Sequence, residues 1–504
     1  MCDDRRNSEW RFKEHRMNMS QPPSKLLPLA AALLVLGAAL VGCAAVGPDF
    51  KPPVTAAPAS FTRESGAGNG SANDATAAAP VALQWWKAYQ SAAIDDLVDR
   101  ALAKNPTIDV AVANLKAAQE NVTAQRGLFY PSVQAGYGLA RQGTGTVLSS
   151  ALANGSTPYT LHTAQLSVGF VPDIFGGNRR LVESLQAQAT SQIYQLDALR
   201  ITLASNVVAA ALQQASLQAQ FRIVADTVEV NRQQLEHLSR LKSLGYSSGI
   251  DLASQEAAYA QSRALLPPLQ KQIEQTRDLI AILCGELPNE RLASVDLDAV
   301  VVPVALPSTL PSHLVAQRPD VQAAVEQAHA NNALVGVAAA NMLPQFSLTA
   351  GLGFSANALA DLLSRGNLVW GLAAGLSQPL FAGGALQARK RGAEALAEAA
   401  LAQYRSTVLT AFQNVADTLY ALDSDGQALT ATRDAEAANE RLLALTQKQF
   451  DQGYTSGLAL LGVKQVYLQA RLSRVAAYGS YLGDTVALYQ SLGGGWTLPS
   501  PPGH

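Results

Sequence analysis

The chain has 504 residues, of which 15% are charged and 48% are hydrophobic, and its formal net charge is −2. This length allows more than one domain and a large core. The chain carries no net basic excess, so electrostatic capture of nucleic acid or of an anionic lipid surface is excluded as its purpose.

The N-terminal region has the layout of a secretory signal peptide, which we place at residues 1–42. An apolar run follows Lys25 and is too short for a membrane-spanning helix, which needs about 20 apolar residues. The charged residues before it do not suit a signal peptide, and Met17 or Met19 is therefore the preferred start.

The apolar run ends in Leu40-Val41-Gly42-Cys43. This sequence is similar to a bacterial lipobox, in which the cysteine receives a lipid anchor. The alternative is an ordinary signal peptide followed by a chance cysteine. Ala44 favours passage to the outer membrane, and residues 43–80, rich in Ala, Gly, Pro, Ser and Thr, are predicted to form a lipidated flexible tether.

The three cysteines, Cys2, Cys43 and Cys284, form neither a disulfide framework nor a metal site by their spacing. Cys284 closes an apolar stretch and is predicted to be a buried thiol.

The remainder of the chain is duplicated, which predicts a first repeat at residues 81–300, a second at 301–497 and a tail at 498–504. Four landmarks recur in the same order at offsets between about 207 and 213, and such self-similarity indicates structural repeats. They pair Asn105-Pro106 with Arg318-Pro319, Tyr130-Pro131 with Leu343-Pro344, Phe175-Gly176-Gly177 with Phe381-Ala382-Gly383-Gly384, and Gly245-Tyr246 with Gly453-Tyr454.

Each repeat contains two stretches in which apolar residues alternate with small or polar ones, at 133–140, 165–170, 346–355 and 368–377. This period predicts strands with one apolar face and one small or polar face. Apolar residues suit lipid, and Gly, Ser and Gln suit the wall of a lumen. A soluble β-sandwich is the alternative. Four strands cannot close a barrel, so a barrel would have to be shared between chains, and a duct favours three or more chains.

A long helix is predicted after each strand pair. Residues 178–244 contain neither Gly nor Pro, and residues 385–452 contain no Pro. Each helix could extend roughly 100 Å. The spacing of Val224, Val228, Leu235 and Leu238 predicts a coiled-coil seam. Shorter helices are predicted at 252–284, broken by Pro267-Pro268, and at 458–492, and further helices at 92–128 and 312–342.

No catalytic or metal site is predicted. The string 245–249 fits G-x-S-x-G, but that motif requires a preceding strand, and a helix precedes it here. The later histidines, including His329, are scattered without ligand spacing. We therefore expect that the protein is not an enzyme.

Several motifs in combination are typical of one known family. They are Cys43 with Val46-Gly47-Pro48-Asp49-Phe50, Pro172-Asp173-Ile174-Phe175-Gly176-Gly177, Arg318-Pro319-Asp320, Gln378-Pro379-Leu380-Phe381-Ala382-Gly383-Gly384, and Val486-Ala487-Leu488-Tyr489 with Gly493-Gly494-Gly495-Trp496. With these residues the chain resembles the TolC-like outer-membrane efflux proteins, in the branch of NodT-type lipoproteins, from about residue 43 to residue 497.

The resemblance implies an α+β membrane protein. It would be a homotrimer with a 12-strand barrel in the outer membrane, four strands per chain, above a periplasmic α-helical barrel. It implies the outer-membrane channel of a tripartite efflux pump, a passive duct for drugs or other small molecules. Its partners would be a periplasmic adaptor (membrane-fusion) protein, an inner-membrane RND-type pump and outer-membrane lipid. No cofactor is implied beyond the lipid on Cys43.

In the family, the turns that follow the long helices form the periplasmic tip and the surface that docks the adaptor. Glycine at a helix C′ position takes a positive φ at little cost, and Ser248 and Ser456 are predicted to cap the returning helices. The tip residues carried over are Gly245, Tyr246, Ser248, Gly249 and Asp251 in the first half, and Gly453, Tyr454, Ser456 and Gly457 in the second.

Asp251 and Lys464 are the candidate gate. Asp251 would form an acidic ring by symmetry, or would be a first-turn acid that complements the helix dipole. Family members carry acids in the second tip, where this chain has Ala459 and Gly462. Cation selectivity is therefore not carried over, and Lys464 could instead pair with Asp251 of a neighbouring subunit. The alternative functions are a passive porin and an adhesin-like structural protein, neither of which needs paired helices of this length.

Overall fold

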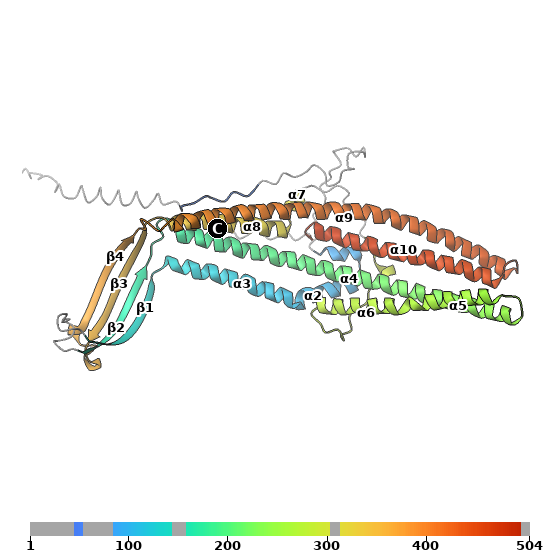
Figure 1. The fold of residues 1–504 in the computed structure, drawn as a ribbon, viewed down its shortest axis with the longest axis horizontal. Coiled ribbons are helices and arrows are strands. Elements are labelled where there is room, and N and C mark those ends of the chain that lie inside the picture. The colour runs from blue at the N-terminus through green and yellow to red at the C-terminus, as the bar shows by residue number, and fades with distance from the viewer. Residues whose placement is uncertain (1–44, 54–83, 144–157, 303–312, 495–504) are drawn as a thin grey trace, which may run out of the picture.

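The structure is a computed structural model that describes residues 45–53, 84–143, 158–302 and 313–494. The chain is elongated, with a β-sheet at one end and a rod of long helices extending from it (Figure 1). The predicted signal peptide, Cys43, most of the predicted tether and the tail at 498–504 lie outside the described residues.

The sheet has four antiparallel strands in the order β1-β2-β3-β4. The strands are β1 (Ser132–Gln142), β2 (Tyr159–Phe170), β3 (Gln345–Ala356) and β4 (Leu368–Ser377). Each half supplies one hairpin, and the pairing of β2 with β3 joins the two halves. This arrangement leaves β1 and β4 as the edges of the sheet within one chain.

The strand register confirms the two predicted faces, because directly opposed residues point to the same side of a sheet. Along one line across the sheet, Gln134 lies opposite Ser167, Ser167 opposite Gly351, and Gly351 opposite Gly371. On the other side Leu166 lies opposite Leu352, and Leu352 opposite Trp370, whose side chain is 74% exposed in the single chain.

Strand β2 begins six residues before the predicted start at residue 165. The alternation fails in these added residues, because His162 lies opposite Leu139 on the apolar side and Leu161 lies opposite Ala140 on the small or polar side. A strand predicted from alternation alone therefore does not extend through them.

Two helices of 67 residues form the rod, as predicted: α4 (Gly177–Ser243) and α9 (Ala385–Asp451). After α4 the chain returns as α5 (Gly249–Ala264) and α6 (Leu266–Leu283), and after α9 as α10 (Gly457–Ser491). Ahead of the strand pairs lie α2 (Ala92–Lys104), α3 (Pro106–Arg126), α7 (His313–Ala316) and α8 (Pro319–Ala340). Among the described residues there are also short 3-10 helices, and the longest, η1 (Trp85–Tyr89), precedes α2.

Three predicted helices are divided. The stretch 92–128 is interrupted at Asn105, whose side chain accepts a hydrogen bond from the backbone N–H of Thr107 at 2.8 Å. The stretch 312–342 is interrupted near Arg318, before Pro319. The break in 252–284 falls at Leu265 rather than at Pro267-Pro268, because proline is tolerated in a first helical turn and α6 therefore begins just before the pair.

The main core lies where α2, α4, α6 and α10 meet. Leu97, Val208, Leu212 and Leu482 are at most 1% exposed there. Cys284 is fully buried beside them, as predicted, and burial raises the pKa of its thiol to about 11. The predicted seam on α4 is only partly right, because Val224 is buried while Val228, Leu235 and Leu238 are half-buried, and Ile223, Val230, Asn231 and Gln234 are buried in their place.

Among the described helices, none combines the length and the apolar character that crossing a membrane would require.

Candidate functional site

Both helical hairpins turn at the end of the rod that lies farthest from the sheet (Figure 1). The first turn joins α4 to α5 and the second joins α9 to α10. The start of α10 packs against the end of α4, since a Cβ added at Gly457 would lie 3.9 Å from the ring of His237. The structure thus brings the two predicted sets of tip residues to the same end of the molecule.

The two turns have the same hydrogen-bond pattern. The N–H of Tyr246 donates to the carbonyl of Leu241 at 2.8 Å, and the N–H of Gly245 to that of Lys242 at 3.0 Å. The second turn repeats this pattern with Tyr454 and Gly453. This is the Schellman motif, which requires a positive φ at the glycine, and φ is 81° at Gly245 and 78° at Gly453.

Serine caps the returning helix in both turns, as predicted. Ser248 Oγ accepts a hydrogen bond from the N–H of Asp251 at 3.1 Å, and Ser456 Oγ from that of Ala459 at 3.2 Å. In the first turn Asp251 Oδ2 also accepts from the N–H of Ser248 at 3.1 Å, which completes a capping box.

These hydrogen bonds show how Asp251 is held within one chain. Its carboxylate accepts from the side chains and backbone around Ser248, and these bonds hold the pKa of Asp251 below its usual value. Asp251 is thus a first-turn acid of α5. Lys464 lies on α10, where its charge helps to lower the pKa of Glu229 on α4, after the larger effect of Arg232.

The tip surface is apolar as well as polar. Tyr246, Ile250 and Tyr454 are each 81% exposed, and Leu244 is 63% exposed. Large apolar side chains exposed to this degree at one end of a molecule are typical of an interaction surface.

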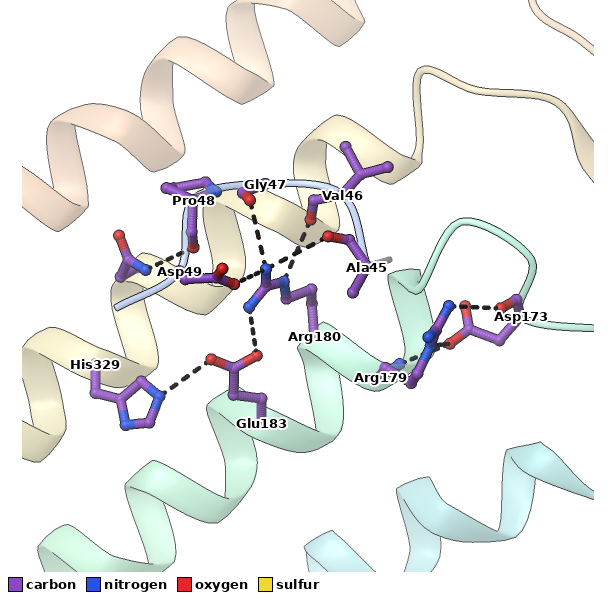
Figure 2. Close-up of polar contacts among 11 residues, drawn as sticks. Ala45, Val46, Gly47, Pro48, Asp49, Asp173, Arg179, Arg180, Glu183 and His329 are labelled. Atoms are coloured by element: carbon purple, nitrogen blue, oxygen red, sulfur yellow. Dashed lines mark hydrogen bonds and ion pairs between the residues drawn. The ribbon is translucent and has the colours of Figure 1, made fainter. Parts of the chain in front are cut away.

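A second site, which the sequence did not reveal, holds the segment 45–53, here called the strap. The strap crosses the start of α4 and the middle of α8 (Figure 2). The Val46 N–H donates to the carbonyl of Phe175 at 3.1 Å. Glycine is needed at both sides of the crossing, because a Cβ on Gly47 would lie 2.4 Å from the Cα of Gly336.

Arg180 is the centre of this site and is only 5% exposed. Its guanidinium donates to Asp49 Oδ1 at 2.6 Å and to Glu183 Oε2 at 2.8 Å. It also donates to the carbonyl oxygens of Ala45, Val46 and Gly47, at 3.3–3.4 Å. A buried guanidinium with this many acceptors binds both the charge and the backbone of the strap.

The strap site escaped sequence analysis because its partners are far apart in the chain. Arg180 and Asp49 are separated by 131 residues, and His329 and Glu183 by 146. No local spacing reports such pairs. The motif Val46-Gly47-Pro48-Asp49-Phe50 belongs to the family resemblance, but its residues alone do not indicate a docked segment.

Among the residues that the structure describes, no group of three His, Cys, Asp or Glu side chains is arranged to hold a metal ion. The two tips and the small, polar face of the sheet are instead suited to contact and passage.

Comparison with known proteins agrees with this architecture. A family model described as outer membrane efflux protein matches residues 97–286 and 310–494. The probable efflux pump outer membrane protein TtgC of Pseudomonas putida is 28% identical over 94% of this chain and 96% of its own length. The pyoverdine export outer membrane protein OpmQ of Pseudomonas putida is 30% identical, over 83% of this chain and 89% of its own.

Solved structures show the same fold. The outer-membrane channel OprN superimposes with a TM-score of 0.77 at 28% identity and covers 89% of this chain and 99% of its own. CusC superimposes with a TM-score of 0.75 at 22% identity, over 89% of this chain and all of its own.

The fold and its two tips therefore define the subunit of an outer-membrane efflux channel. The chain belongs to the outer membrane efflux protein family. Channels of this fold are trimers, so the four strands of one chain are a third of a 12-strand barrel in the outer membrane, and the long helices form the helical barrel that extends into the periplasm. This identification favours the efflux channel over the porin or adhesin alternative.

Proposed function

We propose that this channel is the exit duct of a tripartite pump and that its two tips bind a periplasmic adaptor protein, through which it works with an inner-membrane RND-type pump. The observation that carries this proposal is the placement of both Schellman turns at the same end, with Tyr246 and Tyr454 each 81% exposed. Exposed tyrosines on rigid turns supply contact area at a low entropic cost.

The substrates are small molecules that pass without being chemically changed, so the protein is not an enzyme in this proposal. The small, polar face of the sheet supports it, because Gly351, Gly371 and Ser167 leave room and neither attract nor repel charge. One relative is named for the efflux of toluene and another for the export of pyoverdine, two molecules of different chemistry. A duct with a neutral wall suits such diversity, and drugs or metabolites are the proposed class.

The chain is further proposed to carry lipid on Cys43. The lipobox-like sequence before Cys43 supports this, as does the docking of the residues just after it, because Ala45 lies against Gly176 and Val46 bonds to the carbonyl of Phe175. Incorporation of labelled palmitate into the native protein, and its loss in Cys43→Ser, is the expected result. Labelling that persists in Cys43→Ser would refute the assignment.

The adaptor proposal is tested by in-cell photo-crosslinking. A photo-reactive residue replaces Ser247 or Thr455 at the tips, and a control replaces Leu363, which is 75% exposed in the β3–β4 connection. Mass spectrometry is expected to recover a periplasmic adaptor from both tip positions and not from the Leu363 control. Recovery of self-crosslinked trimers alone would contradict docking at the tips.

The gate proposal for Asp251 and Lys464 is tested separately. Within one chain Ser248 Oγ donates a hydrogen bond to Asp251, and the charge of Lys464 lies near Glu229. An ion pair between Lys464 and Asp251 would therefore have to form between subunits. Lys464→Ala is then expected to change single-channel conductance and drug sensitivity. Unchanged values in Lys464→Ala would remove Lys464 from the gate.

A further inference from the structure

The strap is held at its far end by His329 of α8. The ring of Phe50 stacks on the imidazole ring, with centroids 4.7 Å apart and an interplanar angle of 11°. Next to this stack the side chain of Asn332 donates to the carbonyl of Pro48 at 3.0 Å. The imidazole therefore forms part of the surface on which the strap lies, one helical turn before the hydrogen bond from Asn332 to the strap backbone.

Both ring nitrogens of His329 face carboxylates. Nε2 lies 3.1 Å from Glu183 Oε1, and Nδ1 lies 3.4 Å from Glu326 Oε2 (Figure 2 shows the bond to Glu183). A neutral imidazole has only one N–H, so at the other nitrogen a ring lone pair would face a lone pair of the carboxylate oxygen. Only the imidazolium can donate to both carboxylates at once.

The groups around His329 favour its protonation. Glu326 faces it from α8, and Glu183 from α4, where Glu183 also binds Arg180. Asp49 of the strap and Tyr404 of α9 line the adjoining cavity of about 730 Å³. Tyr194 of α4 lies near enough to Glu326 for their charges to interact. The hydrogen bond with Glu326 and then that with Glu183 raise the pKa of His329 above 6.5, against the effect of burial.

We propose that His329 is a proton-operated clasp for the strap: the imidazolium bridges Glu183 and Glu326 and holds the ring of Phe50, and its deprotonation loosens residues 45–53. Because the folded pKa is raised, the stabilisation is complete below pH 6.5 and is lost as the pH rises through the folded value. Arg180 keeps its charge throughout and holds the other end of the strap, so deprotonation loosens the strap without releasing it.

The clasp is a site that responds to the acidity of the periplasm, the compartment into which the helices extend. It would control how firmly the chain that follows position 43 is fixed to the body. The inference depends only on the docked strap, so it holds whether or not Cys43 carries lipid and whether or not the tips bind an adaptor.

The test is hydrogen–deuterium exchange of the purified full-length trimer at pH 6 and pH 8, with rates expressed as protection factors so that the intrinsic pH dependence is removed. We expect the protection of the peptide that contains Val46 and Phe50 to fall about tenfold between the two values in the native protein. In His329→Gln the protection of this peptide should be low and equal at pH 6 and pH 8. In His329→Arg the planar guanidinium can also donate to two carboxylates, so the protection should be high and equal at pH 6 and pH 8.

His162→Gln is the matched control, because His162 lies on β2 and bonds with Tyr137, far from the strap in the chain. It should retain the native pH dependence. The paired substitutions make the test independent of simple misfolding, since Arg and Gln are predicted to change protection in opposite directions. Equal protection at both pH values in the native protein, or an unchanged pH dependence in His329→Gln, would overturn the proposal.

Discussion

The two long helices α4 and α9 have the same length and begin and end with similar signals, yet they occupy different environments. Helix α4 contacts α2, α3, α5, α6, α8 and α10, whereas α9 contacts α7, α8 and α10. Val207 and Val208 on α4 are fully buried, while Leu409 and Tyr420 on α9 are 70% and 67% exposed. The duplication produces the same helix twice, and the neighbouring elements of each copy determine which of its side chains are buried.

Helix α9 has two apolar faces. Tyr404, Val408 and Val415 point into the chain and are at most 6% exposed. Leu409, Tyr420 and Leu445 recur at spacings that place them together on a second face, and each is at least 60% exposed. An exposed apolar stripe on a subunit of a trimer indicates the surface that a neighbouring subunit covers.

The largest expected effect follows from this second face. Leu409→Glu would bury a carboxylate without a partner at the subunit contact, which costs several kcal/mol for each chain. We expect the trimer to be lost, as measured by mass photometry in detergent. Asn414→Glu is the control, because Asn414 is exposed and lies off both faces. If Leu409→Glu still assembled as well as Asn414→Glu, the stripe would not be a subunit contact.

The second prediction compares the two tips directly. Gly245→Ala and Gly453→Ala each place a Cβ on a left-handed residue, which costs about 1 kcal/mol per chain. Because the two turns share one hydrogen-bond pattern, the thermal unfolding midpoints of the two variant proteins should fall by the same amount. Gly462→Ala, in the interior of α10 with open space around the new Cβ, should raise the midpoint instead. Unequal losses at the two tips would show that one turn is supported by contacts that the other lacks.

The sequence predicted the repeated features well because their signals are local. Alternating residues identified the strands, the lack of proline identified α4 and α9, and Ser248 and Ser456 were recognised as caps. Signals that depend on distant residues were missed. Arg180 is distinguished from other helix residues only by Asp49, which is 131 residues away in the chain, and Leu265, at the break between α5 and α6, has no unusual side chain.

A third prediction concerns a difference between the returning helices. Asp484 of α10 lies near Asp425 of α9, and at the same offset the first half has Thr276 and Leu217. Burial and then the charge of Asp425 raise the pKa of Asp484 to about 6, and the Oδ2 of Asp484 is buried without a hydrogen-bond partner among the described residues. A raised carboxyl pKa means that stability falls as the pH rises from about 4 to 6.

Asp484→Asn should therefore stabilise the protein by about 1 kcal/mol per chain at pH 7.5, after allowance for partial solvent screening. The gain should disappear at pH 4, where Asp484 is protonated in the native protein. Thermal denaturation at the two pH values measures both effects. Asp423→Asn, at an exposed position of α9, should leave the stability unchanged at both pH 7.5 and pH 4. A gain in Asp484→Asn that persisted at pH 4 would point to packing rather than to charge.

The smallest effect concerns the acid that distinguishes the two tips. Asp251 completes a capping box at the start of α5, and Ala459 stands at the equivalent place in α10. Asp251→Ala should make the amides in the first turn of α5 exchange about threefold faster, and Ala459→Asp should slow those of α10 to a similar degree. The lowered pKa of Asp251 means that its contribution is present at neutral pH and is lost as the pH falls through the folded value, so the two tips should exchange alike in strong acid. If Ala459→Asp instead altered ion selectivity in planar bilayers while Asp251→Ala did not, the second tip alone would line the narrowest part of the duct, and the first would serve only to hold the turn.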